Sequence, residues 1–396
     1  GTVRADCVLQ NYKIKGIIHL SGNNLFTLSV PTKKILVAPL DWGLGHTTRC
    51  LPVIEALLQD GHTIVLAAEG SSARILTDRF PQLQLLPLKG YHIRYSRSAG
   101  MFMPRLLLQV PKIINRIVYE HRWLKKVQKE HQFDVVISDN RYGLYHSALT
   151  SVIMTHQVQI LSGMGAWADG NLCAWHRKML ERFDQCWIVD RATEGLSGLL
   201  AHPPRLPRNA SYIGTLSQLM CSPITATASA DHCLVLLSGP EPMRSQLEQI
   251  LWAQCCALPQ YTFHFVAGNM QGEVPDNCPE HIQYHPFLGG EALQGLMHTA
   301  RVVVCRSGYS TLMDLDWLQK PAIMIPTPGQ TEQEYLAGHL AKTSQNLYYP
   351  QQDIQLAAGL AYIYGKQPYN IPEMLQSGQP GGLKTLSQQL RALLYK

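Results

Sequence analysis

KILVAPLDWGLGHTTR, residues 34–49, combines three signals of one fold. Its apolar run at 35–38 has the length and composition of a buried β-strand, and the apolar residues after position 50 are typical of a helix. Between them lies a short loop that contains Gly43 and Gly45 and is followed by His46. A strand, a glycine-containing loop and a helix in this order predict the first unit of a parallel α/β sheet.

The same alternation continues along the chain and then restarts. Short continuous runs of apolar residues, separated by helical stretches, are typical of parallel sheets with helices on both faces. Strands are expected in the first half at 35–38, 63–68, 83–86, 134–138, 152–155 and 186–189, and in the second at 233–237, 261–266, 282–284, 301–305, 322–325 and 347–349.

Residues 216–232 are rich in Ser, Thr, Ala and Pro and predict a linker between two domains. We therefore expect an α/β protein with two doubly wound Rossmann-like domains, at 33–215 and 233–380, and a cleft between them. Residues 1–32 carry weak patterning and are expected to form an extension. The last segment, 381–396, has leucines at helical spacing and is expected to pack back toward the first domain.

The composition is that of a globular protein with a modest positive charge. Of 396 residues, 46% are hydrophobic and 16% are charged, which excludes a disordered chain. The formal net charge of +6 suits anionic substrates or an anionic membrane surface, and it is too dispersed to indicate nucleic acid binding. The ten cysteines lack CxxC spacing and are expected to be reduced thiols of a cytoplasmic protein. The sequence contains no run of 18 apolar residues, so no membrane span is predicted.

The loop after the first strand is either a simple turn or a phosphate-binding site. Gly43 and Gly45 permit positive φ and a close approach of backbone to a ligand, and the following helix offers free N–H groups at its N-terminus. The GxGxxG pattern is absent because Arg49 stands near the third position, which disfavours an NAD dehydrogenase. A turn does not need the imidazole of His46, so a functional role is favoured. Asp41 is expected either to serve as a base or to form an Asx turn.

Three further loops follow strands of the second domain, at the sheet edge where ligands of such folds bind. One contains Ser238-Gly239, and another is the polar stretch 327–334. The most informative is RVVVCRSGYSTLMD at 301–314, in which a buried strand ends in Arg-Ser-Gly and a helix opens with hydroxyl residues. This composition either binds a diphosphate at the helix N-terminus or only caps that helix.

From about residue 34 to residue 342, the chain resembles GT-B glycosyltransferases, and most of all those of family 28. That family includes the N-acetylglucosaminyltransferase that makes the lipid-linked disaccharide of peptidoglycan. The resemblance rests on the order of short blocks, which are Gly45-His46, Ile213-Gly214-Thr215, Ser238-Gly239, His285-Pro286-Phe287-Leu288, Cys305 to Asp314, Ile325-Pro326 and Glu332-Gln333-Glu334. It implies a nucleotide sugar as co-substrate and no cofactor.

Positions that match the family's motifs take their expected roles from the resemblance. Leu288 is expected beside the nucleobase, and Asp314 at the ribose, where the family usually has Glu. Gln333 and Glu334 are expected at the donor sugar, and the acid at the second position leaves the identity of the sugar open. His156 and Gln157 are expected to face the sugar or the acceptor. The diphosphate is expected among Gly43, Gly45, Ser238, Gly239, Arg306, Ser307, Gly308, Ser310 and Thr311.

The implied mechanism is inverting and independent of metal. Retaining GT-B enzymes carry two glutamates seven residues apart, whereas Ser307 stands seven residues before Asp314. Asp314 and Asp316 resemble a metal-binding Asp-x-Asp, yet residues i and i+2 of a helix face apart, so no metal site is expected. His46 is the first choice for the base that deprotonates the acceptor, with Asp41 and Asp139 as alternatives.

Two stretches of the first domain bear on the acceptor. SDNRY at 138–142, with Asn140 and Arg141, follows a strand and either binds the acceptor or is a turn. Residues 101–129 combine apolar residues at helical spacing with seven basic residues. This pattern indicates either contact with an anionic membrane surface or a buried stripe with a solvated basic face. The first alternative implies a lipid-linked acceptor and a peripheral place on the inner face of the cytoplasmic membrane.

The leading hypothesis is a glycosyltransferase that moves a sugar, expected to be an N-acetylhexosamine, from a UDP-sugar to a hydroxyl acceptor such as a lipid-linked sugar or another cell-envelope glycan. Two alternatives stay open. A sugar-nucleotide 2-epimerase shares the fold but needs no acceptor surface. A non-catalytic nucleotide-sugar-binding partner needs no base, so that replacement of His46 would leave it unaffected.

Overall fold

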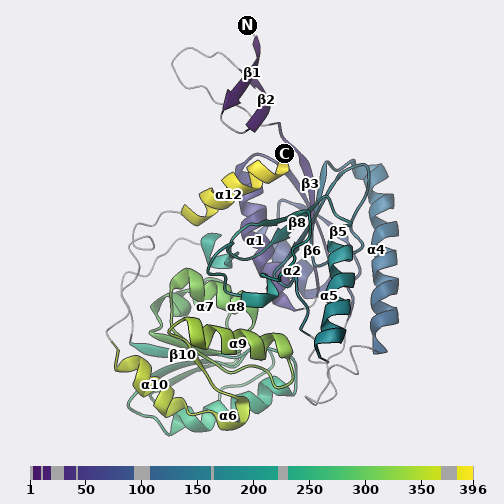
Figure 1. Ribbon diagram of the computed structural model, residues 1–396. Helices are drawn as coiled ribbons and strands as arrows, with labels where there is room; N and C mark the ends of the chain where they lie inside the picture. The colour runs from purple at the N-terminus through teal and green to yellow at the C-terminus, as the bar shows by residue number, and fades with distance from the viewer. Residues whose placement is uncertain are drawn as a thin grey trace.

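Two parallel sheets, each covered by helices, occupy successive parts of the chain and confirm the predicted α/β fold class (Figure 1). The computed structural model describes residues 3–9, 12–18, 31–41, 43–92, 108–161, 165–221, 231–366 and 381–395.

The first sheet has seven parallel strands in the order β5-β4-β3-β6-β7-β8-β9. The chain builds β3, β4 and β5 in one direction and then crosses to β6 on the other side of β3, so the topological switch lies between β3 and β6. Its strands are β3 (Lys34–Pro39), β4 (Thr63–Ala68), β5 (Gln84–Pro87), β6 (Val135–Asp139), β7 (Thr150–Thr155), β8 (Gln185–Ile188) and β9 (Ala210–Tyr212), of which β9 was not expected. Its helices are α1 (Leu44–Gln59), α2 (Gly70–Arg79), α4 (Val110–His131), α5 (Ala166–Leu180) and the short η2 (Gly198–Leu200).

The second sheet repeats the plan with six parallel strands in the order β12-β11-β10-β13-β14-β15. Its switch lies between β10 and β13, which are direct neighbours. The strands are β10 (His232–Leu236), β11 (Thr262–Val266), β12 (Ile282–His285), β13 (Val302–Cys305), β14 (Ala322–Met324) and β15 (Leu347–Tyr348). The helices are α6 (Met243–Cys256), α7 (Gly290–Thr299), α8 (Tyr309–Leu318), α9 (Thr331–Thr343), the short η4 (Gln351–Asp353) and α10 (Leu356–Tyr364).

Burial on both faces explains why the strands read as continuous apolar runs. Ile35, Leu36 and Val37 point to alternate faces of the first sheet, yet each is at most 1% exposed. In the second sheet, Val302, Val303 and Val304 also alternate between the two faces, and each is 0% exposed. A strand that buries only one face would have needed polar residues in alternation.

The predicted extension and linker both contain ordered elements. Within residues 1–32, β1 (Val3–Leu9) and β2 (Tyr12–Ile18) form an antiparallel hairpin. At the start of the predicted linker, Leu216 and Leu219 are each 1% exposed, and η3 (Gln218–Cys221) packs against α1 and α8. These residues therefore belong to the packed boundary between the domains, while 222–230 lie outside the described residues.

The last helix, α12 (Gly381–Leu394), lies against the first domain in Figure 1. It contacts α1 and η3, with Leu390 fully buried, and both Ser387 and Arg391 donate to the carboxylate of Asp60. The start of α12 meets the end of η3 and a side chain of α8. A Cβ at Gly382 would lie 2.8 Å from Met220 Cε and 2.4 Å from Trp317 Cη2.

The nine cysteines outside the hairpin are free thiols, and five of them are buried. Cys255 and Cys256 are adjacent on the last turn of α6 and point to different environments, one buried and one half-buried. Their role in the described fold is that of small packing residues.

Replacement of Leu390 by Ala tests the contribution of α12. We expect a loss of about 2–5 kcal/mol in the free energy of unfolding, because the side chain is fully buried against α1 and its removal leaves a cavity. Denaturant unfolding measures the loss. Gln389→Ala, on the exposed face of the same turn, is the matched control and should change stability by less than about 0.5 kcal/mol. Equal stability of the two variants would show that α12 does not support the fold.

Candidate active site at the domain boundary

The predicted loops of the first domain meet at its topological switch, where ligands of open α/β sheets bind. The loop after β3 carries His46 into the first turn of α1, and β6 ends at Asp139. His156 follows the end of β7, the next strand along the sheet. Three chain segments that are far apart in sequence therefore place polar side chains at one edge of the sheet.

Asp139 is the fully buried centre of this group. It accepts two hydrogen bonds from Arg49, from Nε at 2.7 Å and from Nη2, and His46 Nδ1 lies 3.1 Å from its Oδ2. Burial alone raises the pKa of a carboxyl group, but Arg49 and then His46 outweigh it and lower the pKa of Asp139 to about 2. The carboxylate is therefore ionised at neutral pH and paired, so it is a poor candidate for the base.

His46 is the most exposed of these three side chains, with 15% of its side chain exposed against 8% for His156 and 0% for Asp139. Burial and the positive charge of Arg49 lower its pKa, and the carboxylate of Asp139 opposes them. Its imidazole is consequently neutral at pH 7, as a base must be.

Arg49 was missed as a functional residue, because its position was examined only for a third glycine. It is 3% exposed, and its Nη2 and Nη1 lie 2.8 Å from His46 Nδ1 and from His156 Nδ1. In the orientation that satisfies its own hydrogen bonds, Asn140 also accepts from Arg49 Nη2 at 3.3 Å. The sequence signal was present, since Arg49 stands one helical turn after His46 and so shares its face of α1.

The second domain reaches this cluster through α8 and α9. The ring of Tyr309 stacks on that of His156 with 4.3 Å between ring centroids, and its hydroxyl donates to the carbonyl oxygen of Val189 at 2.7 Å. Glu332, in the first turn of α9, lies 2.8 Å from His156 Nε2. Glu332 was missed in favour of its two neighbours, because the sequence alone does not give the rotation of α9 about its axis.

The N-termini of α1 and α8 approach each other closely. A Cβ at Gly45 would lie 2.0 Å from Ser310 Oγ, so the absent side chain allows this approach. Gly43, just before α1, has φ of 89°, a conformation that favours glycine. No side chain caps either helix, and neither has an acidic residue in its first turn. Both therefore present free N–H groups.

The carboxylate of Asp314 contacts the chain between the domains. Its Oδ1 accepts from Ser217 Oγ at 2.7 Å and its Oδ2 from Gln218 Nε2 at 2.9 Å, and the residue is 5% exposed. Burial raises its pKa to about 6, against these hydrogen bonds. A ribose at this carboxylate would have to displace Ser217 or Gln218.

Two predicted ligand-binding arginines are engaged inside their own domains. Arg141 is 0% exposed and donates to Glu120 and to the carbonyl oxygen of Pro39, so it does not face an acceptor. Arg306 is 2% exposed and donates to the carbonyl oxygens of Ile325, Pro326 and Met243, so it closes loops rather than meeting a diphosphate. Burial lowers the pKa of Arg306 to about 10, at which it keeps its charge at neutral pH.

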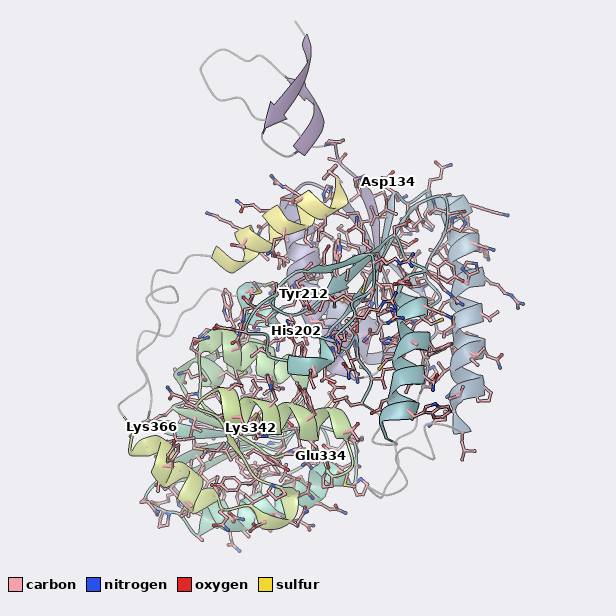
Figure 2. All side chains as sticks on the ribbon, viewed as in Figure 1. Asp134, His202, Tyr212, Glu334, Lys342 and Lys366 are labelled. Carbon is pink, nitrogen blue, oxygen red and sulfur yellow. The ribbon has the colours of Figure 1, made fainter. Side chains whose placement is uncertain are left out.

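The remaining donor-side residues line the switch of the second sheet or hold its loops. Gln333 Oε1 accepts from Thr327 N, and the carbonyl oxygen of Gln333 accepts from Ser307 Oγ at 2.7 Å. Glu334 is exposed at the opposite end of α9 from Lys342 and accepts from Gly329 N (Figure 2). Exposed or half-buried positions at these loops are Ser238, Gly239, Leu288, Gly308, Ser310 and Thr311, and Gln157 is half-buried on the first domain. These roles stay predictions.

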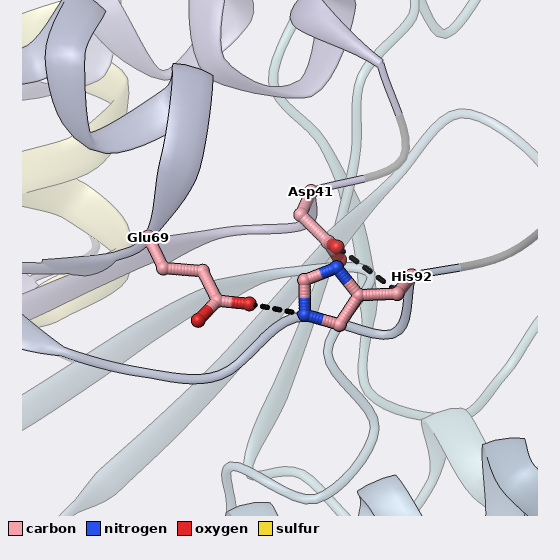
Figure 3. A group of neighbouring side chains, drawn as sticks. All are labelled: Asp41, Glu69 and His92. Carbon is pink, nitrogen blue, oxygen red and sulfur yellow. Dashed lines mark hydrogen bonds and ion pairs between the residues drawn. The ribbon is translucent and has the colours of Figure 1, made fainter.

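Asp41 belongs to a different cluster from His46. Its two oxygens accept from the backbone N–H groups of Tyr91 and His92 at 2.8 and 3.2 Å, and Glu69 pairs with His92 Nε2 at 2.6 Å (Figure 3). The three side chains are the one group among the described residues with a spacing that could hold a metal ion. Their hydrogen bonds already explain the arrangement, because they fix residues 90–92 against the first loop. Trp42, beside Asp41, lies outside the described residues.

Comparisons with known proteins agree with the two-domain fold. Residues 251–390 match the glycosyltransferase family 28 C-terminal domain. A UDP-N-acetylglucosamine–N-acetylmuramyl-(pentapeptide) pyrophosphoryl-undecaprenol N-acetylglucosamine transferase of Synechococcus is 21% identical over 92% of this chain and 95% of its own. The solved glycotransferase of kitacinnamycin is 14% identical, with a TM-score of 0.62 over 91% of this chain and 96% of its own. Acinetobacter baumannii MurG is 14% identical, with a TM-score of 0.53 over 91% and 100%.

These findings confirm the predicted two-domain GT-B fold and support the predicted likeness to family 28 glycosyltransferases. The match to the family begins within α6 and ends within α12, so it covers most of the second domain but not β10. The first domain joins the comparison through the full-length relatives and the shared fold.

The raised pKa of Asp314 predicts how stability depends on pH. A carboxyl group whose pKa is higher in the folded protein stabilises it below pH 4, and this contribution is lost as the pH rises through 6. We expect the wild type to lose about 2 kcal/mol relative to Asp314→Asn between pH 4 and pH 7. Denaturant unfolding at several pH values measures the difference. Asp353→Asn, on η4 of the same domain, is the control, and an equal dependence on pH in the wild type and in Asp314→Asn would contradict the assignment.

Proposed function

We propose that the protein transfers a sugar from a UDP-sugar to a hydroxyl acceptor with inversion of configuration and without a metal ion. The observation that carries the proposal is the contact between neutral, partly exposed His46 and ionised Asp139, at the switch of one sheet and opposite the N-terminus of α8. A base on one domain and a phosphate-binding helix on the other are the two parts that inverting transfer needs.

His46 acts as the base. With its proton on Nδ1 and directed to Asp139 Oδ2, its Nε2 has a free lone pair for the acceptor hydroxyl. The acceptor oxygen attacks the anomeric carbon, the bond from that carbon to the diphosphate oxygen breaks, and UDP leaves with the electron pair. The proton of the acceptor passes to His46 Nε2. The two alternatives are less suited, because Asp139 is fully buried and both oxygens of Asp41 accept backbone hydrogen bonds.

The leaving diphosphate is stabilised by the helix N-termini. The uncapped N-terminus of α8 carries a partial positive charge of about half an electron and free N–H groups, and Ser310 adds a hydroxyl beside Gly45. Such fixed donors stabilise developing charge without reorganisation, so the reaction does not require a metal. The positive charge of Arg49 lies within the same cluster.

The name of the Synechococcus relative supports an N-acetylhexosamine as the donor sugar and a lipid-linked hydroxyl as the acceptor. The 2-epimerase alternative uses the same nucleotide site but no acceptor. A hydroxyl acceptor is favoured because the base cluster stands on the first domain, across the boundary from the expected nucleotide loops.

The first domain also offers a surface for a peripheral membrane contact on the cytoplasmic side. Leu108 is 81% exposed and Ile114 and Val118 are 50% and 42% exposed, among the basic residues Lys112 and Arg116. Apolar side chains with basic neighbours bind anionic lipid interfaces. Among the described residues, no helix has the length and apolar character to cross a bilayer.

Replacement of His46 by Gln tests the proposed reaction. We expect kcat for sugar transfer from UDP-N-acetylhexosamine to fall by about 10²–10⁴-fold, because the base is lost. UDP binding, followed by thermal shift, should persist, since most of the expected donor contacts lie on the second domain. His131→Gln, at the end of α4 and away from the site, is the control. A protein stabilised by NAD but by no UDP-sugar would contradict the donor class, and full activity of His46→Gln would exclude His46 as the base.

Vesicle binding tests the membrane contact. We expect sedimentation with vesicles that contain anionic lipid and little with vesicles of neutral lipid, and Ile114→Ser/Val118→Ser should weaken binding by about tenfold or more, since two apolar side chains lose their burial. Equal binding of the double variant and the wild type would place the contact elsewhere.

A further inference from the structure

Arg49 donates toward both His46 and His156. Its effect on the position of the ring hydrogen differs between the two histidines. A guanidinium group only donates, with one N–H on Nε and two on each terminal nitrogen. Nε and one hydrogen of Nη2 are taken by Asp139. The other Nη2 hydrogen faces His46 Nδ1 at 2.8 Å and, at the longer distance of 3.3 Å, the side-chain oxygen of Asn140. An Nη1 hydrogen is available to His156 Nδ1 at 2.8 Å. Arg49 is therefore shared between the two rings.

The proton of His156 has a defined position. Arg49 can only donate to its Nδ1, which must therefore be unprotonated. Glu332 at neutral pH can only accept from its Nε2, which must therefore carry the hydrogen. Although burial opposes ionisation, His156, His46 and Arg49 lower the pKa of Glu332, which keeps the carboxylate charged. Both neighbours thus select the same neutral tautomer of His156.

The two neighbours of His46 require different protonation states of its Nδ1. Its Nδ1 faces Arg49 Nη2 at 2.8 Å, a donor that requires a lone pair, and Asp139 Oδ2 at 3.1 Å, an acceptor that requires a hydrogen. With a hydrogen on Nδ1, Nε2 is a base. With a lone pair on Nδ1, Nε2 carries the hydrogen and is a donor. The position of Arg49 therefore decides between two chemical roles of His46.

We propose that Arg49, His156 and Glu332 are positioning residues. Through them, the docking of the second domain determines whether Nδ1 of His46 carries a hydrogen. Glu332 fixes the tautomer of His156, His156 holds Arg49 through Nη1, and Arg49 sets the state of His46 Nδ1. This chain of contacts crosses the domain boundary, because Glu332 belongs to α9 and the other residues to the first domain. Its role in catalysis rests on the proposed function, whereas the proton positions do not.

The charged and titratable groups around His46 are Arg49 from α1, Asp139 from β6, His156 after β7 and Glu332 from α9. Removal of a cation near an imidazole raises its protonation midpoint, and removal of an anion lowers it. Variants at the two ends of the chain of contacts should therefore shift the midpoint of His46 in opposite directions.

Histidine ring NMR on the full chain tests the proposal without any substrate, with His46→Gln to assign the resonance. Glu332→Gln should lower the midpoint of His46 by about half a pH unit, and Arg49→Gln should raise it by about one unit. The ring ¹⁵N shifts of His156 in the wild type should show hydrogen on Nε2 and none on Nδ1. If Arg49→Gln does not fold, the Glu332 variant and the His156 tautomer still decide, since the side chain of Glu332 is 35% exposed.

Asp316→Asn is the matched control. It removes another ion pair between the domains, from Asp316 Oδ2 to Arg191 Nη1 at 2.5 Å, without contact to Arg49. It should leave the midpoint of His46 unchanged. An equal shift in Asp316→Asn and Glu332→Gln would assign the effect to domain docking in general and overturn the proposal. A hydrogen on His156 Nδ1, or an unmoved midpoint in Glu332→Gln, would overturn it as well.

Sugar transfer then separates this inference from the proposed function. In Glu332→Gln, the acid limb of kcat/KM should move to lower pH by the same half unit, whereas a structural role would lower kcat/KM equally at all pH values. If the wild type transfers no sugar but the NMR shifts follow the expectation, the proposed function fails and the proton positions stand. If transfer occurs and the limb does not move, the coupling to catalysis is absent.

Discussion

The neutralisation of one buried carboxylate organises the boundary between the two domains. Asp139 stands fully buried at the switch of the first sheet, where an unpaired charge would be strongly unfavourable. Arg49 compensates it with two hydrogen bonds, but this brings a buried cation with further donors that need partners. His46 and His156 meet that need from the first domain, and Glu332 meets the remaining need of His156 from the second. Each contact follows from the unsatisfied group of the one before it.

This polar centre also explains why the domains meet in a specific orientation. Apolar contacts alone tolerate sliding, whereas a series of directional hydrogen bonds does not. Around the centre, Tyr309 stacks on His156 and donates to the first domain, and Ser217 and Gln218 satisfy the buried carboxylate of Asp314. The groups that could perform chemistry and the groups that hold the domains together are therefore largely the same residues. A ligand that enters this boundary must exchange its own hydrogen bonds for some of these.

The strands and the switch points could be predicted from the sequence because both faces of each sheet are buried. Continuous apolar runs mark such strands, and the carboxyl ends of neighbouring strands must share an edge, which brings His46, Asp139 and His156 together. The phase of a helix at a domain boundary could not be predicted, so Glu332 was overlooked beside Gln333 and Glu334. The sequence also does not separate an arginine that faces a ligand from one that closes carbonyl groups inside a domain, as Arg141 and Arg306 do. Arg49 entered the sequence analysis only as evidence that the third glycine of a GxGxxG pattern is missing.

The contact of Gly382 with Met220 and Trp317 joins segments of both domains at one place. The chain leaves the first domain after η3 and returns to it at the start of α12, and these two points touch each other beside α8. The two ends that the first domain offers to the second therefore lie at one packed place, and the polar contacts of the boundary fix the orientation of the domains. Bulk added at Gly382 would therefore press on η3 and α8 at once and disturb the packing of α12 together with the boundary between the domains.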